Sequence, residues 1–225
     1  MATRILFVGN SFVSRNDLPR LVADLAGSAG RAVETAAIVA GGASLRRHVN
    51  AGAVSQALGG SRWDFVVLQE QSTLPIKNRK RYHENVRELD PQIRAAGAAT
   101  VLYMTWARRA APQSQGQITE AVRAIGEEIG ARVAPVGVAW EAVAATHPQI
   151  DLFVADGSHP TAAGSFLAAC VLCATILDDV EHPLTAPASL KVDATSAAVL
   201  MAAARQACLN PSRRSDPART APPRE

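Results

Sequence analysis

The chain has 225 residues, a length typical of one α/β domain that buries a core large enough to need no disulfide or metal support. Hydrophobic residues make up 48% and charged residues 19%, which excludes an intrinsically disordered chain. The net charge of +3 would suit a nucleic-acid binder, but residues 210–225 carry four Arg against two acidic residues and account for +2 of it, so we expect no nucleic-acid partner.

Short apolar runs alternate with amphipathic stretches along the chain. In chain order, the pattern predicts strand 4–9, helix 17–29, strand 33–39, helix 44–58, strand 64–69, helix 81–96, strand 100–106, helix 115–129, strand 131–138, helix 161–177 and helix 188–209. Asp17 can cap the first helix, and Pro19 suits its first turn. Pro135 interrupts the last strand, which favours a place at the edge of a sheet.

Strands that alternate with helices are typical of a parallel sheet covered by helices on both faces. We therefore expect an α/β fold, a three-layer α/β/α sandwich with a flavodoxin-like, mostly parallel five-stranded sheet. Residues 1–209 are expected to form one domain. Residues 210–225 contain four Pro and little apolar surface, and they are predicted to be a disordered tail.

Cysteine usage and the apolar runs indicate the compartment. The three cysteines, Cys170, Cys173 and Cys208, are too few and odd in number for a disulfide framework. Cys170 and Cys173 lie in an apolar helix and are predicted to be core residues. No signal peptide is visible and no apolar run is long enough to span a membrane, so a cytoplasmic location is expected. The sequence leaves the oligomeric state open.

Ligands of open parallel sheets bind beyond the carboxyl ends of the strands, which directs attention to the residues there. No dinucleotide fingerprint, phosphate loop, GxSxG elbow or zinc-binding spacing occurs, so neither a metal nor an organic cofactor is expected. What remains is Ser11 after the first strand, and Asp156 and His159 before a long helix. Three residues apart, Asp156 and His159 can share one turn, so that His159 is oriented by Asp156 and takes the Ser11 proton.

Serine catalysis also needs N–H donors where negative charge develops on the substrate. Three strand ends offer candidates for this oxyanion hole. They are the backbone N–H of Ser11, the backbone N–H of Gly42 and the side-chain amide of Gln71. Asn10 and Trp106 also lie at strand ends and are possible residues of the substrate pocket.

These blocks resemble the SGNH (GDSL-like) hydrolase family, named for a Ser, a Gly, an Asn and a His on separate blocks. Its first block matches Gly9-Asn10-Ser11, its second-block glycine matches Gly42 ahead of Ser44, and its last block matches Asp156 to Pro160. The resemblance covers roughly residues 4–177. It implies a serine hydrolase in which Ser11, Asp156 and His159 are the catalytic residues.

The third block departs from the family pattern. Where the family usually has Gly-x-Asn-Asp, this chain has VVLQEQS, which resembles a branch of the family with LQEQS. Alignment by the strand end places Gln69 on the Gly, Gln71 on the Asn and Ser72 on the Asp. Gln71 is therefore the favoured oxyanion donor and Gln69 the alternative, whereas Glu70 between them is interpreted as outward-facing or as a supporting residue.

The sequence thus predicts an esterase that hydrolyses a small-acyl ester, possibly an acetyl ester, through an acyl-enzyme. Two alternatives stay open. An acyltransferase would use the same residues with an alcohol in place of water, and a non-catalytic flavodoxin-like binding module would retain the site without turnover. The expected partner is a small-molecule ester.

Overall fold

The computed structural model describes residues 2–179, 185–187 and 190–209. In this part of the chain, five parallel strands form one sheet in the order β2-β1-β3-β4-β5. The strands are β1 (Thr3–Gly9), β2 (Val33–Val39), β3 (Phe65–Leu68), β4 (Ala99–Tyr103) and β5 (Arg132–Ala134). The order is that of flavodoxin-like sheets, and the predicted fold class is confirmed.

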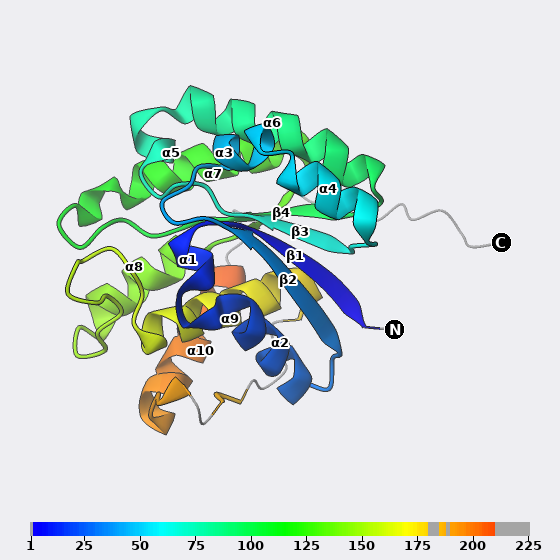
Figure 1. Ribbon diagram of the computed structural model, residues 1–225. Helices are drawn as coiled ribbons and strands as arrows, with labels where there is room; N and C mark the ends of the chain where they lie inside the picture. Colours follow the sequence, from blue (N-terminus) through cyan, green and yellow to red (C-terminus); the bar gives the residue numbers. More distant parts are fainter. Residues whose placement is uncertain (1, 180–184, 188–189, 210–225) are drawn as a thin grey trace.

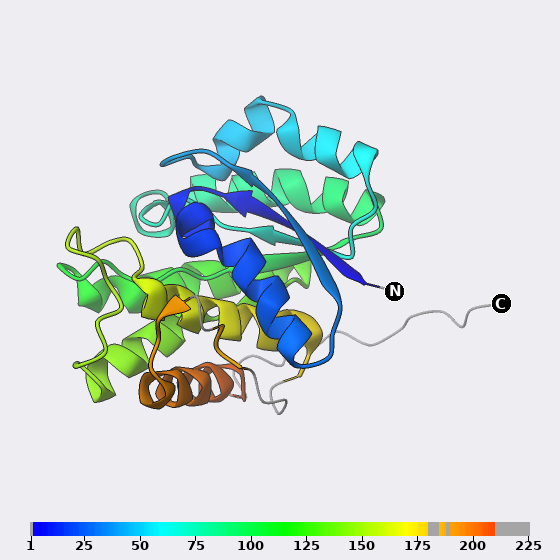
Figure 2. The same ribbon diagram turned by 60° about the horizontal axis from the view of Figure 1, so that its bottom comes forward.

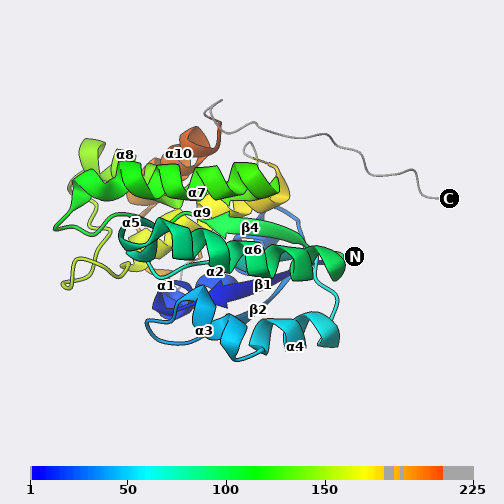
Figure 3. The ribbon, with the colours of Figure 1, turned by 90° about the horizontal axis from the view of Figure 1, so that it is seen from above.

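Helices cover both faces of this sheet (Figure 1). The α-helices are α1 (Ser11–Ser14), α2 (Leu18–Ser28), α3 (Leu45–Asn50), α4 (Ala53–Gly60), α5 (Leu74–Lys77), α6 (Arg79–Ala95), α7 (Gln115–Ile129), α8 (Val136–Thr146), α9 (Ala162–Leu177) and α10 (Ala194–Leu209). Short 3-10 turns lie at Arg15–Asp17 and Pro112–Ser114. Helices α3, α4, α6 and α7 form one layer (Figure 3), and α2, α8 and α9 form the other, with α10 packed outside α9 (Figure 2).

The alternation of residues along β1 explains the two layers. Ile5 and Phe7 point into the core beneath α2 and α9, whereas Leu6 and Val8 point into the core beneath α6 and α7. Each of these four side chains is at most 1% exposed. A strand that is apolar on both faces requires cover on both, which is why the apolar runs of this sequence give a three-layer fold.

Helix α9 is buried between the sheet and α10. Its cysteines confirm the interpretation of Cys170 and Cys173 as core residues, since both are free thiols with at most 2% exposure. Burial raises the pKa of the Cys173 thiol to about 12 and that of Cys170 well above its usual value. Neither thiol is therefore a reactive nucleophile at neutral pH. In the described part of the chain, no helix is both long enough and apolar enough to cross a membrane.

Several predicted boundaries are wrong for identifiable reasons. The strand predicted at 131–138 ends at Ala134, because Pro135 precedes helix α8, which the sequence analysis missed. The helix predicted at 44–58 is divided into α3 and α4 by Gly52, whose φ of +66° is left-handed. The last helix begins at Ala194 and not at residue 188, although residues 188–189 lie outside the described residues. The predicted tail, 210–225, also lies outside them.

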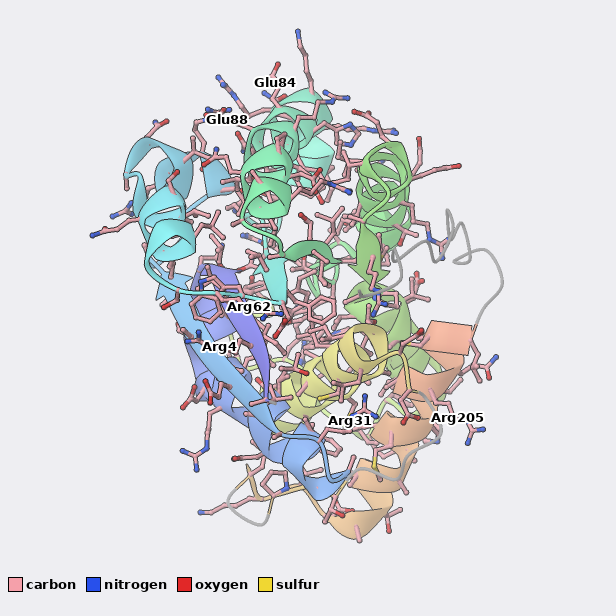
Figure 4. All side chains as sticks on the ribbon, turned by 90° about the vertical axis from the view of Figure 1, so that its right-hand side faces the viewer. Arg4, Arg31, Arg62, Glu84, Glu88 and Arg205 are labelled. Carbon is pink, nitrogen blue, oxygen red and sulfur yellow. The ribbon has the colours of Figure 1, made fainter. Side chains whose placement is uncertain are left out.

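The carboxyl ends of the strands meet at one edge of the sheet, where the chain leaves β1 at Gly9 and β3 at Leu68. Figure 4 looks at the opposite edge, where Arg4 on β1 and Arg62 ahead of β3 lie near the strand starts. The two ends of the sheet therefore carry different residues. The polar residues singled out by the sequence gather at the carboxyl edge.

Candidate active site

Ser11 is the first residue of α1, directly after β1. Asn10 caps this helix, because its Oδ1 accepts the Phe12 N–H at 3.1 Å. The Asn10 Nδ2 donates to the Ala43 carbonyl at 2.9 Å, and the Asn10 N–H donates to Gln69 Oε1 at 2.9 Å. Asn10 thus fixes the turn that presents Ser11 and ties it to the loops after β2 and β3.

Ser11, His159 and Asp156 form one hydrogen-bonded chain. The Ser11 Oγ lies 2.8 Å from His159 Nε2, and the His159 Nδ1 lies 2.6 Å from Asp156 Oδ2. The ring of His159 is 27% exposed and the Asp156 side chain is 47% exposed, so the pair is open to solvent. A hydroxyl, an imidazole and a carboxylate in this order are the arrangement that makes a serine nucleophilic.

The turn from Asp156 to His159 is built by Asp156 itself. Its Oδ1 accepts the Ser158 N–H at 2.8 Å and the His159 N–H at 2.9 Å, while Gly157 adopts a φ of +64°. The two backbone hydrogen bonds, together with the bond to the imidazole, hold the pKa of the Asp156 carboxyl well below its usual range. The carboxylate is therefore ionised wherever His159 has to act as a base.

An aromatic stack supports this turn from behind. The Trp106 Nε1 donates to the Ser158 carbonyl at 3.0 Å, and Trp106 stacks between Phe12 and Trp140 with centroid distances of 4.9 and 3.8 Å. The ring of Phe12 meets His159 edge to face at 5.3 Å. Trp106 is 1% exposed and Asn10 is 4% exposed. The structure therefore gives both residues a supporting position, and their place in a substrate pocket stays a prediction.

Comparison with solved structures places this geometry in a family. A protein from Slackia heliotrinireducens assigned to the SGNH hydrolases is 35% identical, with a TM-score of 0.68 over 78% of this chain and 100% of that one. The chain belongs to the SGNH hydrolase family. The resemblance inferred from the sequence is therefore confirmed at the level of the family, and the protein is a hydrolase.

More distant structures share the fold. A DUF4886 family protein from Bacteroides uniformis is 20% identical, with a TM-score of 0.75 over 96% of this chain and 98% of that one. An acetylxylan esterase from Geobacillus stearothermophilus is 14% identical, with a TM-score of 0.61 over 81% of this chain and 97% of that one. No family model and no curated protein matches the sequence.

The third block of this SGNH hydrolase contains two glutamines in different environments. Gln69 is fully buried, and its amide is used within the fold, since Oε1 accepts the Asn10 N–H and Nε2 donates to the Glu70 carbonyl. Gln71 is partly exposed, and its Oε1 accepts the Thr73 N–H at 3.0 Å and the Thr73 hydroxyl at 2.9 Å. These bonds fix the amide orientation and leave the Gln71 Nε2 with no partner among the described residues. Of the two amide NH₂ groups, that of Gln69 is buried and bonded within the fold, whereas that of Gln71 belongs to a partly exposed side chain and is unbonded within the described residues.

The second block supplies a backbone donor. Gly42 is exposed in a turn and has a φ of +63°, a conformation that favours glycine. Within the described part of the chain, the N–H groups of Gly42 and Ser11 donate to no internal acceptor. The three predicted donors thus have no internal partner in that part of the chain, and their assignment to an oxyanion hole stays a prediction.

Residues around the site include some that sequence reasoning did not assign. His48 is 4% exposed and its Nε2 lies 2.7 Å from the Gly9 carbonyl, directly before the serine turn. Glu70 is also 4% exposed, so it is a supporting residue and not an outward one. A single sequence gave no signal for His48, because its partner is a backbone carbonyl 39 residues away.

A cavity of about 310 Å³ lies between α8 and the loop that follows β4. Arg109 and Phe153 are among its lining residues, and the Arg109 N–H donates to the Gly157 carbonyl at 2.9 Å. The Arg109 guanidinium pairs with Asp151 and lies 5.2 Å from the centre of the Phe153 ring. Arg109 therefore supports the Asp156–His159 turn.

Among the described residues, no group of three or more His, Cys, Asp or Glu could hold a metal ion.

Proposed function

We propose that this SGNH hydrolase is a serine esterase that hydrolyses short-acyl esters, acetyl esters foremost, through an acyl-enzyme. The observation that carries the proposal is the continuous chain from Ser11 Oγ through His159 to Asp156, with distances of 2.8 and 2.6 Å. These are hydrogen-bond distances suited to proton transfer from the hydroxyl to the imidazole.

In the acylation step, Ser11 Oγ attacks the ester carbonyl as His159 Nε2 takes its proton. The carbonyl oxygen becomes an oxyanion, which the N–H groups of Ser11 and Gly42 and the Nε2 of Gln71 stabilise. Asp156 stabilises the imidazolium that forms. His159 then gives its proton to the leaving alcohol as the carbon–oxygen bond of the ester breaks, which leaves the acyl group on Ser11.

Water completes the cycle by the same route in reverse. His159 takes a proton from water as the water oxygen attacks the acyl carbon, and the same donors bind the second oxyanion. The bond to Ser11 breaks, the serine oxygen regains its proton from His159, and the carboxylic acid leaves. No group beyond the ester and water is consumed.

Support for a short acyl group comes from one of the related structures. The Geobacillus protein is an acetylxylan esterase, and it shares this fold over 81% of the present chain. The test is hydrolysis of p-nitrophenyl esters from acetate to octanoate by the purified chain, with carboxylate and nitrophenol quantified together. The proposal expects the highest kcat/KM for acetate or propionate. A maximum at octanoate would contradict the short-acyl assignment.

Replacing Gln71 by alanine is expected to lower kcat by about 10²-fold, in the range typical for loss of one oxyanion donor. KM for p-nitrophenyl acetate should change little, because the oxyanion exists only in the transition state. Gln69→Ala is the matched comparison, since it removes a buried side chain that bonds to Asn10. Its main expected effect is a lower melting temperature. If Gln69→Ala lost more kcat than Gln71→Ala while remaining folded, the assignment would have to be exchanged.

A further inference from the structure

Glu70 is a buried carboxylate beside the proposed oxyanion hole. It is the second residue after β3, between the two glutamines, and it is 4% exposed. Burial raises the pKa of its carboxyl, and hydrogen bonds from Asn85, Gln71 and Leu45 oppose that rise. Since a buried ionic group is seldom a gain in stability over apolar side chains, its presence here calls for another explanation.

One oxygen of Glu70 joins two loops. Its Oε1 accepts the Gln71 N–H at 2.7 Å and the Leu45 N–H at 3.0 Å. Leu45 follows Gly42 by three residues and begins α3, so this oxygen holds both loops that carry proposed oxyanion donors. The Gly42 loop is held from its other side by Asn10, whose Nδ2 donates to the Ala43 carbonyl.

The other oxygen of Glu70 is held by a chain that leads to the surface. Its Oε2 accepts the Asn85 Nδ2 at 2.8 Å, and the Asn85 Oδ1 accepts the Arg46 Nε at 3.0 Å. Arg46 on α3 pairs in turn with Glu88 on α6 at 2.5 Å. Both carboxylate oxygens are therefore engaged within the fold. Because Glu70 is also 4% exposed, its carboxylate is not placed to act on a substrate as a general base.

We propose that Glu70 is a positioning residue that sets the Gly42 N–H and the Gln71 side chain at a common point, the place of the oxyanion. The inference rests on the proposed esterase function and names a residue outside the three donors. Loss of the Glu70 contacts should lower kcat and leave KM nearly unchanged, because the oxyanion forms only during the reaction. A displacement of the donors by about 1 Å can lower the rate on the order of 10²-fold.

The test exchanges the hydrogen-bond donor and acceptor in the contact between Glu70 and Asn85. In Glu70→Gln, one side-chain oxygen still accepts the Leu45 and Gln71 N–H groups, but the new amide NH₂ faces the donor Nδ2 of Asn85. In Asn85→Asp, two carboxylates face each other. Each single variant should lower kcat for p-nitrophenyl acetate by at least about tenfold, with KM within about twofold.

The double variant restores the contact with its polarity reversed. The amide NH₂ of Glu70→Gln would donate to the new carboxylate of Asn85→Asp, which also accepts from Arg46, and the net charge is unchanged. We expect the double variant to recover most of the kcat that each single variant loses. Two independent effects on stability would add and would not produce this recovery. Measurements are made below the melting temperature of every variant.

A matched control comes from the other end of the sheet. Asp90 is a buried carboxylate, 6% exposed, whose oxygens accept Arg94 Nε and Thr100 Oγ1, both at 2.7 Å. Asp90→Asn should lower the melting temperature and leave kcat unchanged.

The outcomes separate the two proposals because Ser11→Ala is assayed alongside. Ser11-dependent hydrolysis with full kcat in Glu70→Gln, or a double variant as slow as the single ones, would overturn the role of Glu70 and leave the esterase proposal intact. If the wild-type chain shows no Ser11-dependent hydrolysis, the esterase proposal fails and the positioning role fails with it.

Discussion

Replacing Ser11 by alanine should lower kcat for p-nitrophenyl acetate by about 10⁴- to 10⁶-fold, because no other group can form the acyl-enzyme. The Ser11 hydroxyl bonds to His159 Nε2 at 2.8 Å. Its loss leaves the Asn10 cap and α1 in place, so the melting temperature should stay close to that of the wild type. Initial rates and thermal unfolding by circular dichroism measure both quantities.

Ser14 provides the control for this experiment. It lies at the other end of α1 and is exposed. Ser14→Ala therefore removes one serine hydroxyl from the same helix, as Ser11→Ala does, but at a position that does not contact His159. The control should retain wild-type kcat. Hydrolysis by Ser11→Ala at more than a tenth of the wild-type rate would exclude Ser11 as the nucleophile.

Replacing Asp156 by asparagine should lower kcat by about 10⁴-fold, the loss typical when the orienting carboxylate of such a chain becomes an amide. The new side-chain oxygen can still accept the Ser158 and His159 N–H groups. The amide NH₂ would then face His159 Nδ1 and favour the tautomer with the proton on Nε2. That tautomer cannot take the proton of Ser11. Steady-state kinetics on the folded variant measure the loss.

The pH dependence of kcat provides a second test of the role of Asp156. Backbone hydrogen bonds from His159 and Ser158 hold the pKa of its carboxyl well below the usual value, so the carboxylate is already ionised above about pH 5. At alkaline pH, where the His159 imidazole is neutral in both proteins, the ratio of wild-type to Asp156→Asn kcat should thus be nearly constant. A ratio that still changed with pH in that alkaline range would mean that the Asp156 carboxyl titrates there, contrary to this geometry.

The fold was largely predictable because its strands are apolar on both faces. Periodicity placed all five strands and most of the longer helices, since a parallel sheet covered on both sides needs continuous apolar runs. It missed α8, where the apolar residues around Pro135 were assigned to the last strand. Length was the available signal, because the mostly apolar stretch from Val133 to Val143, interrupted by Glu141, is longer than an ordinary strand.

The candidate site was predictable where it depends on order along the chain. Ser11 follows a strand, and Asp156 and His159 are three residues apart, so sequence spacing alone brings the second pair together. The positions of Asn10 and Trp106 were not predictable, because burial depends on partners far away in the sequence. Trp106 faces the Ser158 carbonyl across 52 residues, and Asn10 faces Ala43 across 33.

The choice between Gln69 and Gln71 illustrates the same limit. Both follow β3 and differ by two residues, so alternation along the strand places them on the same side. What separates them is the Asn10 N–H, which occupies the Gln69 amide oxygen, and Thr73, which orients the Gln71 amide. Neither contact has a signature in the sequence. Glu70 likewise looks like any polar residue of a loop until its partners at Leu45 and Asn85 are seen.

The most direct test of the serine nucleophile is covalent labelling with a fluorophosphonate probe, followed by intact-mass and peptide mass spectrometry. The active protein should take up one probe per chain, on the peptide that contains Ser11, in step with the loss of esterase activity. The Ser11→Ala variant should take up none. Stoichiometric labelling at another residue, or full activity in a chain labelled at Ser11, would contradict the account.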